Sequence, residues 1–173
     1  PDALYEIVKA INDTGAGVLY TDEDKVSMDG RHYFDPNFKP DFNLFRLREN
    51  NYICHIFVVK KSLTDETGLL RSEFDGAQDF DFILRCCEKA QKITHIPKVL
   101  YHWRCHMDST AADPSSKAYA YEAGRKAVRE HYQRLGIDAK VEVTERPGWY
   151  RSHVKVQGNP LISVIIPNKD HTD

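Results

Sequence analysis

Three carboxylates stand side by side at Asp22, Glu23 and Asp24, one residue after the short apolar run at 18–20. The apolar run predicts a buried strand, and we place the acidic triplet on the loop at its C-terminal end. Ligands bind at that edge in open α/β sheets. Hard divalent cations prefer carboxylate oxygens, and a nucleotide diphosphate can complete their coordination shell. The spacing lets one aspartate face a metal and the other a ribose, although an isolated D-x-D is often only a solvated acidic turn.

A second acidic position opens a helix. Gln78 and Asp79 precede apolar residues at the i, i+3, i+4 and i+7 spacing, which predicts an amphipathic helix with Asp79 and Asp81 in its first turn. A carboxylate there can act as a general base toward a hydroxyl group. The alternative is a charge that only stabilises the helix dipole. The apolar residues with this spacing are Phe80, Ile83, Leu84 and Cys87.

A third group of polar residues follows in an alternating segment, which predicts a strand after Pro97. His102 lies in this strand, and histidine is a common metal ligand that also binds phosphate when protonated. Arg104 and His106 follow, and the arginine can bind a diphosphate through two parallel hydrogen bonds. The alternative for His102 is a strand histidine whose hydrogen bonds are satisfied within the fold.

The order of these motifs resembles that of the family 2 glycosyltransferases. The matching segments are 19–25 (LYTDEDK), 76–85 (GAQDFDFILR) and 95–104 (HIPKVLYHWR), and 109–111 (STA) is similar to bacterial members that build cell-surface polysaccharides. The resemblance covers about residues 1–112. It implies an α/β protein with part of a GT-A, or nucleotide-diphospho-sugar transferase, fold, in which a mixed sheet is flanked by helices. A C-terminal β-hairpin and a linker should follow.

The resemblance also implies a reaction: inverting transfer of a sugar from a nucleotide-activated donor to a glycan or lipid-linked glycan acceptor, in surface polysaccharide synthesis. Asp24 and His102 would hold Mn²⁺ or Mg²⁺, while Asp22 and Arg104 would face the nucleotide sugar. Asp79 would deprotonate the acceptor hydroxyl, with Gln78 beside it at the acceptor. Many members have Glu-Asp where this chain has Gln78-Asp79, so the base role falls on Asp79 alone. Asp24, Asp79 and His102 should then converge on one cleft.

The chain is predicted to have three parts. Residues 1–112 would be the metal and acceptor half of a glycosyltransferase domain, and 113–158 a helix starting at Ser115 or Ser116 followed by a hairpin. Residues 159–173 resemble the opening of a second such domain, with 161–166 as a buried parallel strand. We therefore expect a fragment of a tandem protein, inactive by itself. Its incomplete sheet would favour a homodimer.

The other elements are predicted from local patterns. Asp2 can cap a helix with the apolar face Leu4, Ile7, Val8 and Ile11. Residues 29–45, rich in Asp, Asn, Pro and Phe, indicate a long surface loop. Residues 53–59 indicate a strand, and 62–68 a short helix that closes at a glycine.

Composition excludes some function classes. The 173 residues carry a net charge of −2 with scattered lysines and arginines, so we expect no nucleic-acid partner. No apolar run is long enough to cross a bilayer. The four cysteines fit no zinc pattern and are expected to be reduced. We expect a cytoplasmic protein, with peripheral association of the full-length protein at the inner face of the membrane.

Two other functions stay open on these residues. A metal-dependent phosphohydrolase would use Asp22, Asp24 and His102, but it needs further ligands, and no third strand-end carboxylate is evident. A non-catalytic binding module of a polysaccharide assembly enzyme is the other, although an intact D-x-D and Asp79 argue against decay. Turnover of sugar nucleotides would separate these from a glycosyltransferase.

Overall fold

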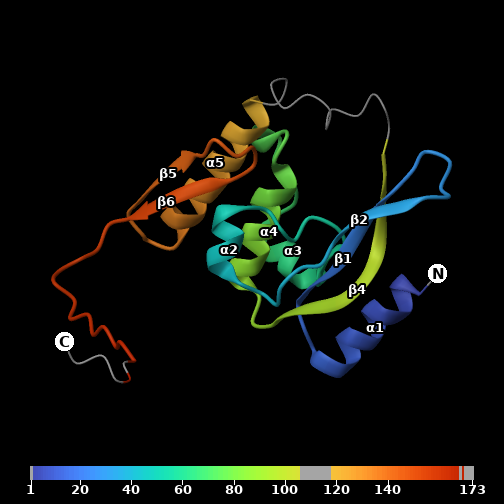
Figure 1. The fold of residues 1–173 in the computed structure, drawn as a ribbon, viewed down its shortest axis with the longest axis horizontal. Coiled ribbons are helices and arrows are strands. Elements are labelled where there is room, and N and C mark those ends of the chain that lie inside the picture. The colour runs from blue at the N-terminus through green and yellow to red at the C-terminus, as the bar shows by residue number, and fades with distance from the viewer. Residues whose placement is uncertain (1, 106–117, 168, 170–173) are drawn as a thin grey trace.

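The computed structural model describes residues 2–105, 118–167 and 169. It is a mixed α/β structure with a four-stranded sheet, flanking helices and a separate two-stranded sheet (Figure 1). The helices are α1 (Ala3–Thr14), α2 (Leu44–Glu49), α3 (Lys61–Thr67), α4 (Gln78–Lys89) and α5 (Ala118–Arg134), with a 3₁₀ turn η1 (Ser72–Phe74). The strands are β1 (Val18–Val26), β2 (Tyr33–Asn37), β3 (Phe57–Val59), β4 (Ile93–Arg104), β5 (Ala139–Val143) and β6 (Tyr150–Val154). The expected fold class is confirmed, and the arrangement is compatible with part of a nucleotide-sugar transferase fold.

Strand β1 is the centre of the larger sheet. It pairs antiparallel with β2 and β3 and parallel with β4. The β1–β4 ladder begins at Val18 opposite Ile93 and ends at Val26 opposite Arg104, with register shifts on both sides of Asp22. Such irregularities re-aim side chains locally. Beyond them the ladder sets Asp24 directly opposite His102.

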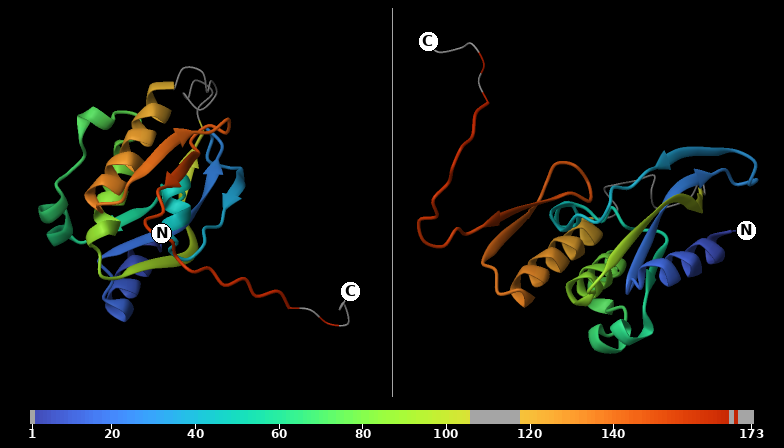
Figure 2. Two further views of the ribbon diagram at one scale, coloured as in Figure 1. Left: turned by 90° about the vertical axis from the view of Figure 1, so that its left-hand side faces the viewer. Right: turned by 90° about the horizontal axis from the view of Figure 1, so that it is seen from below.

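The core lies on both faces of this sheet. Val18 and Tyr20 pack with Phe80, Ile83 and Leu84 of α4 in the main cluster. Leu19 points the other way and packs with Ile7 of α1 and Ile96 of β4, so α1 and α4 cover opposite faces (Figure 2). Alternation of side chains along β1 explains the two clusters.

The acidic triplet lies inside a strand, which corrects the predicted loop. β1 continues to Val26 because 33–37, within the predicted surface loop, form β2 and pair with it, while β4 pairs with its other edge. The β4 strand also begins before Pro97, at Ile93. The proline is accommodated because the register passes from Ile96 to Val99, so Pro97 has no ladder partner on β1.

Two further local predictions are corrected. Only Phe57–Val59 of the predicted 53–59 strand forms β3, because the carbonyls of Ile53 and His55 accept hydrogen bonds from the Lys39 ammonium instead. Asp2 occupies the N-cap of α1 but makes no side-chain capping bond.

Helix α1 buries less of its apolar face than predicted. Of the four apolar residues only Ile7 is buried, and Leu4, Val8 and Ile11 are exposed. The reason is that α1 meets the sheet along a narrow line, through Ile7 and Ala10.

Several local predictions are confirmed. Helix α3 closes at Gly68, α4 has Asp79 and Asp81 in its first turn, and β5 pairs with β6 as a hairpin. Cys54, Cys86, Cys87 and Cys105 are free thiols. The predicted helix start at 115–116 lies outside the described residues. None of the described helices has the length and apolar character needed to span a membrane.

The segment 161–166 is not a buried strand, contrary to prediction. It has no regular secondary structure, and its apolar residues are 77–97% exposed. A strand needs partners for its backbone N–H and C=O groups, and this segment extends away from both sheets (Figures 1 and 2).

Candidate active site

The closest pairing of sequence-predicted site residues is between Asp24 and His102. The ladder places them opposite each other, and His102 Nδ1 lies 2.5 Å from Asp24 Oδ1. The Tyr33 ring packs edge-on against His102 at 4.8 Å between ring centroids. The Asp24 side chain is mostly buried, whereas His102 is 45% exposed. A ligand can therefore reach the imidazole from solvent.

This pair suits a hard cation whose other ligands are waters and substrate phosphates. No group of three or more His, Cys, Asp or Glu side chains in the described part of the chain could hold a metal ion. Mg²⁺ typically takes one or two protein carboxylates and completes its octahedron with waters and substrate phosphates. Asp24 and His102 fit that chemistry. They do not form a preassembled all-protein site.

Asp22 is held inside the fold, away from this pair. Its Oδ1 accepts a hydrogen bond from the Lys39 backbone N–H at 2.9 Å and lies 2.8 Å from His95 Nε2. The imidazole of His95 stacks on Tyr20 at 4.9 Å. The side chains of Asp22 and His95 are each only 4% exposed. Through these two contacts Asp22 holds the Lys39 backbone and the His95 ring in place.

Glu23 is a site residue that the sequence reasoning did not assign. Its Oε1 accepts from Asn37 Nδ2 at 3.2 Å. Its Oε2 is buried and has no hydrogen-bond partner among the described residues, although the Lys39 ammonium lies 3.7 Å away. A buried carboxylate oxygen without a donor is costly, and the nearby Lys39 ammonium offsets part of that cost.

Lys39 is the second residue that the sequence reasoning missed. Its side chain is fully buried, and Nζ donates to the carbonyls of Ile53 and His55 at 2.6 and 2.5 Å. Burial lowers the pKa of the Lys39 ammonium, and the Glu23 carboxylate opposes this shift. The lysine thereby ties the 53–55 loop to the acidic triplet. A Lys-Pro step in a loop gives no sequence signal for such a role.

Asp79 is oriented by that same loop. Asn51 Nδ2 donates to Asp79 Oδ2 at 3.1 Å, while Asn51 Oδ1 accepts from the Cys54 backbone N–H at 3.3 Å. Asp79 lines a cavity of about 260 Å³ together with Cys54, His55 and Tyr101. Burial, and then the carboxylates of Asp79 and Glu23, raise the pKa of the Cys54 thiol to about 12. Cys54 is therefore a neutral thiol and not a nucleophile at neutral pH.

Asp79 and Asp24 line two separate cavities rather than the expected single cleft, and His102 lines neither. Asp24 lines a second cavity of about 260 Å³ with Glu23 and Trp103. The His55 ring joins the two, because it contacts Tyr101 at 4.8 Å and Trp103 at 5.7 Å between ring centroids. Side chains alternate along a strand, so His102 projects from the opposite face of β4 from its two aromatic neighbours. Asp24 and His102 thus meet directly. The contacts of His55 link the cavity of Asp79 to Tyr101 and Trp103, on the other face of β4 from His102.

Gln78 and Arg104 make local contacts. Gln78 Oε1 accepts from the Gly76 N–H at 2.9 Å and closes the turn that starts α4. Arg104 Nη1 donates to the Met28 carbonyl at 2.7 Å and holds the β1–β2 turn. A Cβ at Gly30, whose φ is +73°, would lie 3.2 Å from that nitrogen, which explains the glycine. His106 and 109–111 lie outside the described residues.

Comparisons with known proteins find relatives that are much longer than this chain. The O-antigen biosynthesis protein RfbC of Myxococcus xanthus is 38% identical over 174 residues, which are 100% of this chain and 14% of that protein. This chain is similar to one segment of a much longer protein. The uncharacterized protein y4gI of Sinorhizobium fredii (strain NBRC 101917 / NGR234) is 45% identical over 175 residues, 99% of this chain and 19% of that protein. The chain therefore spans less than a fifth of either relative. No protein-family model matches it.

Proposed function

We propose that this chain contributes metal and acceptor residues to a glycosyltransferase that moves a sugar from a nucleotide-activated donor to a glycan. The main support is the β1–β4 register, which pairs Asp24 with His102 across the two strands. The name of the Myxococcus xanthus relative supports the broader assignment to polysaccharide synthesis. Activity, substrates and partners of a full-length protein are part of this proposal.

On the donor side, Asp24 and His102 would hold Mn²⁺ or Mg²⁺. The ion, when bound, would neutralise the negative charge on the departing diphosphate. Arg104 would contact the diphosphate, because it follows His102 by two residues on the same face of β4. Asp22 would position this strand through Lys39 and His95.

On the acceptor side, Asp79 would be the general base. One of its oxygens is oriented by Asn51, which leaves the other for the acceptor hydroxyl. The proton of that hydroxyl would pass to Asp79 while the hydroxyl oxygen attacks the anomeric carbon and the nucleotide diphosphate leaves. Attack from the side opposite the leaving group inverts the anomeric configuration. Gln78 would border the acceptor at the same helix end.

Replacing Asp24 by asparagine should weaken binding of metal and nucleotide together, since it removes an anionic ligand from a hard cation. The measurement is calorimetry of the full-length protein with UDP and Mn²⁺. Glu66→Gln is the control, because Glu66 is exposed on α3 and makes no ion pair with any other described residue. Unchanged metal-dependent nucleotide binding in Asp24→Asn would remove Asp24 from the donor site.

Replacing Asn51 by alanine should lower kcat by about tenfold to a hundredfold and leave the donor KM unchanged, because it frees the Asp79 carboxylate to rotate. Steady-state kinetics of the full-length protein measures both constants. Asn50→Ala is the control, since it loses a side-chain hydrogen bond to the Gly148 carbonyl, whereas Asn51→Ala loses its bonds to Asp79 and to the Cys54 N–H. Equal loss of kcat in the two variants would show a general structural effect and contradict the positioning role.

A further inference from the structure

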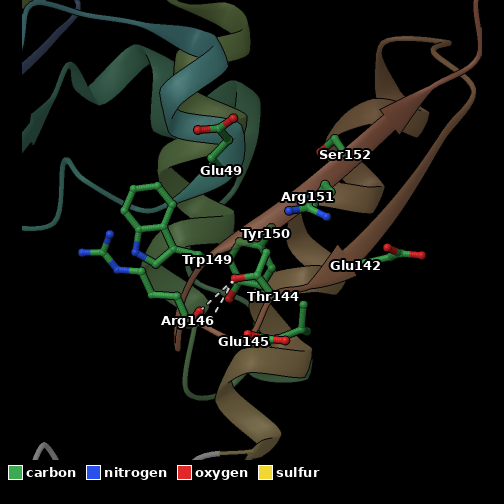
Figure 3. Close-up of a pocket in the computed structure, with 10 residues that line it drawn as sticks. Glu49, Glu142, Thr144, Glu145, Arg146, Trp149, Tyr150, Arg151 and Ser152 are labelled. Carbon is green, nitrogen blue, oxygen red and sulfur yellow. Dashed lines mark hydrogen bonds between the residues drawn. The ribbon is translucent and has the colours of Figure 1, made fainter.

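The largest cavity near the hairpin lies outside the candidate active site. It has a volume of about 620 Å³, against about 260 Å³ for each of the two cavities at the site. Its walls come from the end of α2 and from both strands and the turn of the β5–β6 hairpin (Figure 3). Its volume is in the range of small-molecule sites, about 300–1,000 Å³.

The wall of this cavity is held in place by several contacts. The guanidinium groups of Arg46 and Arg146 each lie 4.3 Å from the Trp149 ring centroid, which fixes the indole. Thr144 Oγ1 accepts from the Arg146 N–H at 3.3 Å and donates to its carbonyl at 3.1 Å, as drawn in Figure 3. The neighbouring Tyr150 is buried, and its hydroxyl packs so closely on α5 that only glycine fits at Gly124.

One polar atom of the cavity lacks a partner. Ser152 Oγ is buried and makes no hydrogen bond with any other described residue. A hydroxyl removed from water without a partner costs roughly 1–3 kcal/mol. Ser152 lines the cavity, so a ligand hydroxyl there would satisfy it.

The charged groups of the cavity have both signs. Glu49, Glu145 and Arg151 line it, and none of the three forms an ion pair or side-chain hydrogen bond with another residue in the described ranges. Carboxylates accept hydrogen bonds and a guanidinium donates them. Each hydroxyl of a neutral sugar does both. With Glu142 and Arg146, the lining has three glutamates and two arginines and no strongly dominant sign of charge. It offers both acceptors and donors, which is what the hydroxyls of a neutral saccharide require.

We propose that this cavity is a subsite for a neutral oligosaccharide. Glu49, Glu145, Arg151 and Ser152 supply hydrogen bonds, and the Trp149 indole, held by Arg46 and Arg146, supplies the aromatic part of the wall. The segment 49–51 connects the subsite to the candidate active site, because Glu49 lines the cavity and Asn51 holds Asp79. Assigning this saccharide as the acceptor chain rests on the proposed function; the binding of a neutral saccharide does not.

The test is binding of the 173-residue chain to an array of immobilised neutral oligosaccharides, with acidic oligosaccharides and free UDP as separate arms. We expect the chain to bind neutral oligosaccharides, and we expect this binding to be the same with and without UDP. Glu49→Gln and Ser152→Ala should each weaken it by about tenfold. Glu66→Gln, a matched glutamate on α3, should bind as the wild type does.

Ser152→Ala also separates a binding role from a structural one. Removing a buried hydroxyl without a partner should leave Tm unchanged or raise it while glycan binding falls. The proposal would be overturned if Ser152→Ala had a lower Tm and unchanged glycan binding. It would also be overturned if the wild-type chain preferred acidic oligosaccharides or bound no neutral oligosaccharide. Glycan binding without sugar transfer by the full-length protein would contradict the proposed function and leave this subsite in place.

Discussion

Replacing Asp79 by asparagine should lower the rate of sugar transfer by about 10²- to 10⁴-fold, the usual cost of losing a general base. Asparagine keeps the size of the side chain and can still accept from Asn51 Nδ2, which donates to Asp79 Oδ2 at 3.1 Å. It cannot take a proton from the acceptor hydroxyl. Nucleotide binding should be retained, because Asp79 lines a different cavity from Asp24.

A turnover assay of the full-length protein beside calorimetry with UDP and Mn²⁺ measures both properties. Asp75→Asn is a suitable control, since Asp75 is an exposed aspartate shortly before α4. Together with Asp24→Asn, the variants should fail in different ways, one in turnover and the other in donor affinity. Wild-type turnover in Asp79→Asn would require another base and would withdraw the acceptor-side mechanism.

Replacing Asp81 by asparagine should destabilise the fold by about 3–5 kcal/mol, the typical cost of removing one partner from a buried ion pair. Asp81 is fully buried. Its carboxylate accepts from Arg71 Nη2 at 2.6 Å and Nε at 3.0 Å, and from Arg85 Nε at 3.0 Å. The substitution leaves the buried Arg85 guanidinium without its counterion.

Urea unfolding gives the free energy of unfolding for this comparison. Glu122→Gln removes a carboxylate from an exposed pair with Arg125, and such surface pairs contribute about 0–1 kcal/mol. If Asp81→Asn cost no more than Glu122→Gln, the Asp81 network would not be a main source of stability.

The same carboxylate should make the fold sensitive to acid. Burial by itself would raise the pKa of Asp81, but the hydrogen bonds from Arg71 and Arg85 outweigh it and hold the pKa below its ordinary value. A lowered folded-state pKa means that the contribution is fully present above the unfolded pKa of about 3.9. It is lost as pH falls through the folded-state pKa. Glu88 adds to this loss of stability in acid. Burial would raise the pKa of Glu88, but its hydrogen bonds with His131 and Arg134 outweigh burial and lower the pKa.

Unfolding free energies measured from neutral pH down to about pH 2 should therefore fall steeply below about pH 4 in the wild type. The fall should be shallower in Asp81→Asn, which has already lost the titrating group. An equally steep acid fall in both proteins would show that Asp81 does not carry this dependence.

The sequence by itself determined the elements that local patterns specify. The apolar spacing around Ile83 and Leu84 is sufficient to define α4 and to put Asp79 in its first turn. The turn at Pro147-Gly148 between alternating segments likewise predicts the β5–β6 hairpin. The order of the motifs, through the family resemblance, identified Asp24 and His102 as site residues. It did not predict that the two residues lie opposite each other on paired strands.

Only the tertiary structure decided which distant residues lie together. Asp24 and His102 are 78 positions apart and Asn51 and Asp79 are 28 apart, so neither contact follows from local periodicity. The burial of Lys39 depends on carbonyls in a loop that local patterns predict to be a strand. The segment 161–166 is likewise predicted to be a strand but forms none in the structure. An apolar run has strand character by itself, but whether it becomes a strand depends on a neighbouring backbone whose hydrogen-bonding groups are free to pair with it.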